Sequence, residues 1–419
     1  MRSSAKLAGA ALLATACGCS ASPPAGHAAT DRQNFATIER GRYMAVVADC
    51  AACHTMPGSG QQWAGGRPIE TPFGKLLAPN ITPDRETGIG AWSDDAFVGS
   101  LLNGTGRGGE HLYPAMPYPY FTRMTRDDAL AIRAYLNTVP AVSNRVVSNQ
   151  LPFPLDIRAS LIAWNALFFK PGRFQPRQDK SAEWNRGAYL VEGPDHCGAC
   201  HTPKNLLGAD KSSEALQGYS LQGWFAPALT NDAYRGLGGW SIDQIVAYLK
   251  TGHNDTAAAA GPMAEEVALS SSQMTDADLR ATATYLKDQP DSGPAKPAPV
   301  AASDPAMKVG SAIYTDECAA CHAPTGSGIA GLFPTLAGSP SVQSREPTSL
   351  LHVLLVGARS VGTQGAPTAA AMPPFRWLLK DDEVAAVATY VRNAWGNAAP
   401  AVSTGDVSQA RRTLARASN

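Results

Sequence analysis

The chain has 419 residues, with 35 basic and 35 acidic side chains and no formal net charge. Hydrophobic residues make up 44% and charged residues only 17%, a composition that excludes an intrinsically disordered protein. Balanced charge gives no basic stripe for nucleic acid, and 39 glycines with 32 prolines predict a loop-rich protein of several small cores.

The N-terminal residues 1–29 have the pattern of an export signal. A short basic segment precedes an apolar stretch, residues 7–16, that is too short to span a bilayer. Two processing sites compete, because a weak lipoprotein box ends at Cys17 and an ordinary cleavage site ends at Ala28. Lipidation and ordinary cleavage both stay open here, and both predict an exported protein. No later apolar run reaches eighteen residues, so no membrane-spanning helix is expected.

Three copies of the motif Cys-x-x-Cys-His contain all six cysteines outside the export signal. Random placement would give about 0.003 such motifs in this chain. On a helix, positions i and i+3 share a face, so both thiols can bond the vinyl groups of one porphyrin edge, and the histidine at i+4 can reach the iron. The sequence therefore predicts three covalent c-type haems, attached at Cys50, Cys53 and His54, at Cys197, Cys200 and His201, and at Cys318, Cys321 and His322.

Other uses of paired cysteines explain the motifs less well. Disulfides in an exported protein need no histidine after each pair. Zinc ribbons bring two such pairs together at short separation, whereas these motifs lie 147 and 121 residues apart. A thioredoxin-like redox motif explains neither the histidine nor the triplication.

The motifs belong to three internal repeats. The residues before the first two motifs read Arg-Gly-x-Tyr at 40–43 and 186–189, and Gly-Ser-Ala-Ile at 310–313 takes that place in the third. In the middle of the repeats, serines following tryptophan are expected to cap helices that end at glycines. These positions are Ser93 and Ser241 for the caps, and Gly104, Gly252 and Gly357 for the ends.

Each repeat closes with a helix that begins with acidic residues, as the helix dipole favours, and contains a tyrosine near its end. Since no run of alternating polarity is convincing, we expect an all-α fold of three tandem domains with loop-rich haem pockets. With their c-type haem motifs, these domains resemble class I cytochrome c. The expected bounds are 35–142, 182–290 and 305–398, followed by a C-terminal tail, 399–419.

Two connectors separate the repeats. Residues 291–304 form a Pro/Ala linker, expected to be semi-rigid and solvated. Residues 143–181 are too apolar for a free linker, because they contain Leu161 to Phe169 with Trp164. They form either a packing segment between the first two domains or a patch that faces a membrane or a partner.

Methionine is the first candidate for the second axial ligand of each haem. Met116, Met263 and Met372 follow the motif histidines by 62, 62 and 50 residues, each next to proline. Flanking prolines favour extended backbone, which suits a loop laid across the far face of a haem. Met124 and Met274 are better explained as packing residues. The remaining histidines, His111, His196, His253 and His352, do not recur at equivalent positions.

Prolines also mark the backbone carbonyls that are expected to hold the motif histidines. A ligating histidine usually donates its second ring N–H to a carbonyl. The repeats offer Pro79, Pro227 and Pro334, at 25, 26 and 12 residues past their histidines. The longer two intervals predict inserted loops at the haem edge.

With these motifs, the sequence resembles the three-haem cytochrome c subunits of membrane-bound periplasmic dehydrogenases. Those complexes oxidise alcohols, gluconate, sorbitol, fructose or aldehydes. The matching stretches are Ala-Pro-Asn-Ile-Thr-Pro-Asp at 78–84, Tyr-Pro-Ala-Met-Pro-Tyr-Pro at 113–119 and Trp-Gly-Asn at 395–397. The resemblance extends from about residue 35 to the end. One departure is that Ala264, not proline, follows Met263.

The resemblance implies that a catalytic subunit of flavin, quinone-cofactor or molybdenum type oxidises the substrate. The three haems then pass electrons to ubiquinone at the periplasmic side of the cell membrane, with the chain attached peripherally or by a lipid. The tail is either a basic amphipathic anchor or a solvated helix.

Two other functions stay open. A free-standing soluble multihaem carrier would need neither lipidation nor an apolar patch. A haem enzyme such as a di-haem peroxidase needs an iron with an open site, and a methionine candidate in every repeat argues against it.

Overall fold

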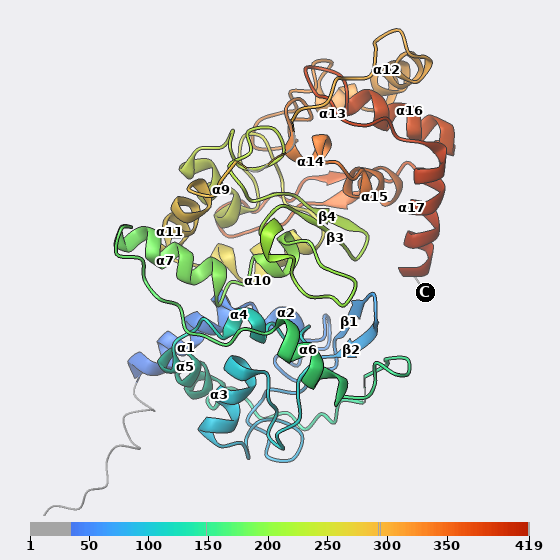
Figure 1. The fold of residues 1–419 in the computed structure, drawn as a ribbon. Helices are drawn as coiled ribbons and strands as arrows, with labels where there is room; N and C mark the ends of the chain where they lie inside the picture. The colour runs from blue at the N-terminus through green and yellow to red at the C-terminus, as the bar shows by residue number, and fades with distance from the viewer. Residues whose placement is uncertain (1–34, 148, 292, 294, 418–419) are drawn as a thin grey trace, which may run out of the picture.

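The computed structural model describes residues 35–147, 149–291, 293 and 295–417. The expected export signal and the lipidation candidate Cys17 therefore lie outside the described residues. Figure 1 shows the repeats one after another, from the blue first segment (35–142) through the second (182–290) to the orange and red third (305–398).

Helices form most of the regular structure. The first segment contains α1 (Phe35–Val47), α2 (Cys50–His54), α3 (Asp94–Asn103), α4 (Tyr118–Phe121) and α5 (Arg126–Leu136). The second contains α7 (Ala182–Glu192), α8 (Gly198–His201), α9 (Ile242–Thr251), α10 (Pro262–Leu269) and α11 (Asp276–Lys287), with 3₁₀ turns at Ser212–Glu214 and Ser271–Gln273. The third contains α12 (Pro305–Glu317), α13 (Ala319–His322), α14 (Pro340–Gln343), α15 (Thr348–Val356), α16 (Asp381–Val391) and α17 (Thr404–Ala417).

In every segment the first long helix packs against the helix that closes the repeat, and the contact is made at a glycine. A Cβ atom on Gly41, Gly187 or Gly310 would lie 1.8, 1.9 or 2.2 Å from a carbonyl oxygen of α5, α11 or α16. No side chain fits in that space, so the glycine of each repeat is required by the close approach of two helices.

The expected helix ends are confirmed. The hydroxyl of Ser93 accepts a hydrogen bond from the first turn of α3, and Ser241 forms a reciprocal capping box at the start of α9. The glycines Gly104, Gly252 and Gly357 follow α3, α9 and α15 with φ of 64°, 83° and 78°. These values lie in the left-handed region that glycine adopts without strain.

The fold is mostly helical, but the all-α expectation needs a correction. Each segment contains one antiparallel pair of short strands: β1 (Pro68–Thr71) with β2 (Gly74–Leu77), β3 (Tyr219–Leu221) with β4 (Trp224–Ala226), and β5 (Ala358–Arg359) with β6 (Ala371–Met372). Strands of two to four residues are too short to show alternating polarity, which is why the sequence pattern missed them. The first two hairpins fill the inserted loops expected before Pro79 and Pro227.

The first two segments pair through a reciprocal exchange of side chains. Arg40 donates to Asp128 of its own segment (2.8 Å), and the hydroxyl of Tyr189 from the second segment donates to the same carboxylate. The second segment has the same arrangement, because Asp278 accepts hydrogen bonds from Arg186 of its own segment (2.8 Å) and from Tyr43 of the first segment (2.6 Å). The Arg-Gly-x-Tyr sequences are thus interface elements.

The third segment lacks these groups at its matching positions. When the repeats are aligned at the shared glycine, Val309 and Ala312 take the places of the arginine and the tyrosine. When they are aligned at the carbonyl that this glycine meets, Glu383 takes the place of the aspartate. It instead joins the second segment at β4, where Ser349 of α15 bonds both backbone groups of Phe225.

The C-terminal tail forms the helix α17, which packs on the third segment with its apolar side and is exposed on its other side. Val407 of α17 is fully buried, and Leu414 also packs on the core of the third segment. Arg411 bonds Asp381 (2.7 Å) at the start of α16. The apolar side of α17 is therefore used for packing within this chain.

The connector after the first segment contains a further helix, α6 (Ser160–Phe168). Trp164 and Phe169 lie edge-on to Tyr118, with ring centroids 6.5 and 5.0 Å apart. Of the two interpretations, packing therefore describes one side of α6, while its other side is exposed.

Candidate haem-attachment sites

Each cysteine motif folds as one helical turn, formed by α2, α8 and α13. A residue in the left-handed region turns the chain into the first two of them, at Asp49 (φ 45°) and His196 (φ 38°). All six motif cysteines are free thiols, so none forms the disulfides considered above. Burial raises the pKa of Cys50 to about 12 and that of Cys53 and Cys318 to about 11, so these sulfurs are held neutral.

The three motif histidines are held by the expected carbonyls. The distance from Nδ1 to the proline oxygen is 2.7 Å for His54 and Pro79, 2.6 Å for His201 and Pro227, and 3.3 Å for His322 and Pro334. Burial lowers the pKa of all three histidines. A neutral imidazole whose Nδ1–H is bonded to a carbonyl presents Nε2 to a metal.

Two of the three methionine candidates lie in irregular or extended backbone. Met116 sits in a turn, with its N–H on the carbonyl of Tyr113 (3.0 Å), and packs against the core of the first segment. Met372 lies in β6 and packs against the core of the third. Both settings agree with a loop that carries an axial ligand.

The backbone expected for Met263 was wrong. Met263 lies in the first turn of α10, behind Gly261 and Pro262, and packs against a small buried cluster of Ala259, Val267 and Val361. Proline at the first helical position favours a helix start as readily as an extended loop, and no proline follows to prevent the helix.

The competing methionines and histidines have other surroundings. Met124 and Met274 are buried in the core shared by the first two segments, as expected for packing residues. His111 bonds Asn165 of the connector, and His352 stacks on Trp224 with ring centroids 4.0 Å apart. His196 is half-buried beside Phe121, with ring centroids 5.5 Å apart.

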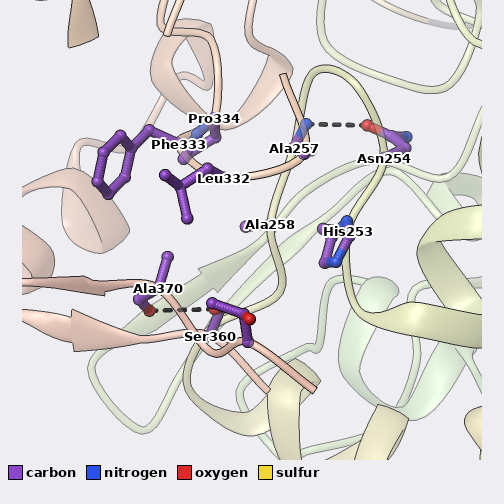
Figure 2. Close-up of a pocket in the computed structure, with 11 residues that line it drawn as sticks. His253, Asn254, Ala257, Ala258, Leu332, Phe333, Pro334, Ser360 and Ala370 are labelled. Carbon is purple, nitrogen blue, oxygen red and sulfur yellow. Dashed lines mark hydrogen bonds between the residues drawn. The ribbon is translucent and has the colours of Figure 1, made fainter. Parts of the chain in front are cut away.

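His253 belongs to a small pocket where the second and third segments meet. Figure 2 shows His253, Asn254 and Ala258 of the second segment facing Leu332, Phe333 and Pro334 of the third. Because Pro334 accepts from His322, this pocket adjoins the third site. It is a point of contact between the second segment and the third site.

Sequence reasoning missed a group of acidic side chains between the first two motifs. Burial raises the pKa of Asp49 to about 8, and it also raises the pKa of Asp195 and Glu266. Arg67 connects the first two segments, because it donates to the carbonyl of Ala52 in the first (2.5 Å) and to the carboxylate of Glu265 in the second. No sequence pattern could identify this group, since its members come from both segments.

The residues present fit three c-type haems. Each site has two free thiols on one helical turn, and a histidine whose second nitrogen is already bonded to a carbonyl. These are the groups needed for two thioether bonds and one axial ligand. Groups of three or more His, Cys, Asp or Glu side chains placed to hold a metal ion by themselves are absent from the described residues.

Comparison with known proteins agrees with this chemistry. The family model for cytochrome c matches residues 38–140, 185–290 and 307–395. The chain is 39% identical to the gluconate 2-dehydrogenase cytochrome c subunit of Pantoea cypripedii over 405 residues, which cover 92% of this chain and 91% of the relative.

Two further relatives are of the same kind. The cytochrome c subunit of the quinone alcohol dehydrogenase of Gluconobacter oxydans is 40% identical over 90% of this chain and 83% of its own length. The fructose dehydrogenase cytochrome subunit of Gluconobacter japonicus is 37% identical over 90% of this chain and 82% of its own.

Proposed function

Because the chain belongs to the cytochrome c family and is similar along most of its length to cytochrome c subunits of gluconate, alcohol and fructose dehydrogenases, we propose that it is an electron-transfer subunit. It carries three covalent c-type haems in three tandem class I cytochrome c domains. It passes electrons from a partner dehydrogenase to ubiquinone. The observation that carries the proposal is the threefold repeat of one site, two thiols and a carbonyl-bonded histidine on a helical turn.

The cysteines form the thioethers, and the axial ligands are His54 with Met116, His201 with Met263, and His322 with Met372. When bound, haem iron supplies one-electron redox chemistry at a potential that methionine ligation raises. The chain itself fixes each imidazole through its proline carbonyl. Met263 has the least support of the three methionines, because it lies in a helix.

The substrate is oxidised outside this chain. The relatives are subunits of dehydrogenases, which supports a catalytic dehydrogenase as the partner. We propose that this partner is of flavin, quinone-cofactor or molybdenum type. We place the chain on the periplasmic side of the cell membrane, exported and held peripherally or by a lipid. Across residues 35–417, apart from the few not described, none of the helices has the length and apolar character needed to cross a membrane.

The test is substrate-driven reduction in the purified complex. The chain is expected to copurify with a dehydrogenase, its haem bands should become reduced on addition of that enzyme's substrate, and ubiquinone should then reoxidise them. A chain that purifies without a partner and exchanges electrons only with soluble carriers would support the free-standing carrier instead. Rapid turnover of hydrogen peroxide would support a peroxidase.

A further inference from the structure

Exposed apolar side chains gather on the connector and on one loop of the second segment. Among the described residues, fifteen large hydrophobic side chains are exposed, and seven of them belong here. The most prominent are Leu206, at 96% exposure, and Phe153, at 80%. We call this set the connector patch; it consists of Phe153, Leu155, Ile157, Ile162, Leu167, Leu206 and Leu207.

Hydrogen bonds join the parts of the connector patch to one another and to the first segment. The indole N–H of Trp164 in α6 donates to the carbonyl of Leu207 (2.9 Å), which joins the helix to the loop of the second segment. The hydroxyl of Tyr113 donates to the carbonyl of Leu155 (2.9 Å), which fixes the stretch before the helix to the first segment. The inner side of α6 is held by Asn165, which bonds the hydroxyl of Tyr118 (2.6 Å).

After the exposed Ser160 at its first position, the outer side of α6 is apolar. Ile162, Ala163, Ala166 and Leu167 are exposed, and no charged residue occurs from 159 to 169. The charges lie at the two ends. Arg158, before the helix, donates to the carbonyl of His111 (2.8 Å) and lies over the ring of Tyr113, whereas Lys170, after the helix, is exposed. One acidic residue, Asp156, also stands on this surface.

We propose that the connector patch is a membrane-docking surface, on which α6 lies flat in the headgroup region of an anionic bilayer. An apolar helix face flanked by basic residues is the pattern of an interfacial helix, and the exposed Lys170 can extend toward the phosphates. Leu206 and Leu207 protrude from a loop and insert beside the helix. The proposal rests on the proposed function, because the ubiquinone that accepts the electrons dissolves in the bilayer.

The other candidate anchor among the described residues is α17, and its apolar side is already packed. The apolar side of α17 is buried against the third segment, so its basic residues have no free apolar face to accompany them. Figure 1 shows α6 beside the first segment, with α12 and α16 of the third segment at the opposite end of the view. Docking through α6 therefore brings the first segment to the membrane and leaves α12 and α16 away from it.

The membrane proposal predicts how the holoprotein binds lipid vesicles. We choose the full chain with Cys17→Ser, so that any acyl group is absent, and vesicles of phosphatidylethanolamine and phosphatidylglycerol. Leu206→Ser with Leu207→Ser should weaken binding by about tenfold or more, since burial of one leucine accounts for about a tenfold change. Ile162→Ser with Leu167→Ser should weaken it similarly.

A matched control lies on the third segment. Trp377 and Leu378 are exposed by 77% and 41%, and replacing both by serine should leave vesicle binding unchanged. Haem absorption spectra of all variants check that the sites are intact.

Three results would overturn the proposal. One is a Cys17→Ser chain that does not bind these vesicles, and the second is a double variant that binds as tightly as its parent. The third is a double variant that keeps vesicle binding but loses the dehydrogenase partner, which would make the patch a protein interface. Quinone reduction in detergent is measured separately, so failure of the proposed function leaves the vesicle result unaffected.

Discussion

The reciprocal tyrosines at the junction of the first two segments offer a quantitative test of the fold. Tyr189 donates to Asp128, whose side chain is only 5% exposed, and Tyr43 donates to Asp278, which is 12% exposed. A hydrogen bond to a buried charged group contributes about 1.5–3 kcal/mol. Each aspartate keeps its arginine when the tyrosine becomes phenylalanine, so the lower figure applies.

We therefore expect Tyr189→Phe and Tyr43→Phe each to lower the free energy of unfolding by about 1.5 kcal/mol. This loss corresponds to a decrease in Tm of about 3–6 °C if the first two segments unfold together as one unit. The effects should add in the double variant, because the two carboxylates are separate. Tm is measured on the haem-loaded protein by circular dichroism.

The control is Tyr135→Phe, since Tyr135 lies against Trp63 in the first segment and takes no part in this interface. If the two interface variants unfold at the same temperature as the control, the exchanged hydrogen bonds do not hold the segments together and the reasoning is refuted.

Three further predictions concern single residues. Met263→Leu should remove about one third of the weak methionine–iron absorption band, whereas Met124→Leu should preserve it; an unchanged band in the first variant means that another group binds the second iron. Asn165→Ala releases Tyr118 from the connector, so the band of the first site should disappear at a lower temperature than in the parent protein. Burial raises the pKa of Asp49 from 3.8 to about 8, so the folded chain binds a proton that the unfolded chain releases, and stability should fall as pH rises between these values. Asp49→Asn should remove that slope and stabilise the protein at pH 8 by on the order of 1–3 kcal/mol; a parent whose Tm is constant over this range would contradict the assignment.

Local features were predictable from the sequence because they depend on neighbouring residues. The caps at Ser93 and Ser241 and the left-handed glycines after the helices follow from the chemistry of a single turn. The carbonyls of Pro79, Pro227 and Pro334 could be assigned because each repeat supplied a copy of the same arrangement.

Features that depend on two segments were not predictable in this way. The Arg-Gly-x-Tyr sequence was visible, but its role needs Asp128 to face a tyrosine from another repeat. The same holds for the acidic group around Asp49, whose members come from both segments. The basic residues of α17 suggested an anchor because its packing against the third segment is not visible in the sequence. Met263 illustrates a different limit, because proline is compatible with both a loop and a helix start.

The haem content of the purified chain tests the central proposal most directly. The mass of the denatured polypeptide and its pyridine haemochrome spectrum together give the number of covalently attached haems. Three haems per chain, with one lost when Cys197 and Cys200 are both replaced by serine, is the result that we predict. Two or fewer haems in the unaltered chain, or haem that is released on denaturation, would contradict it.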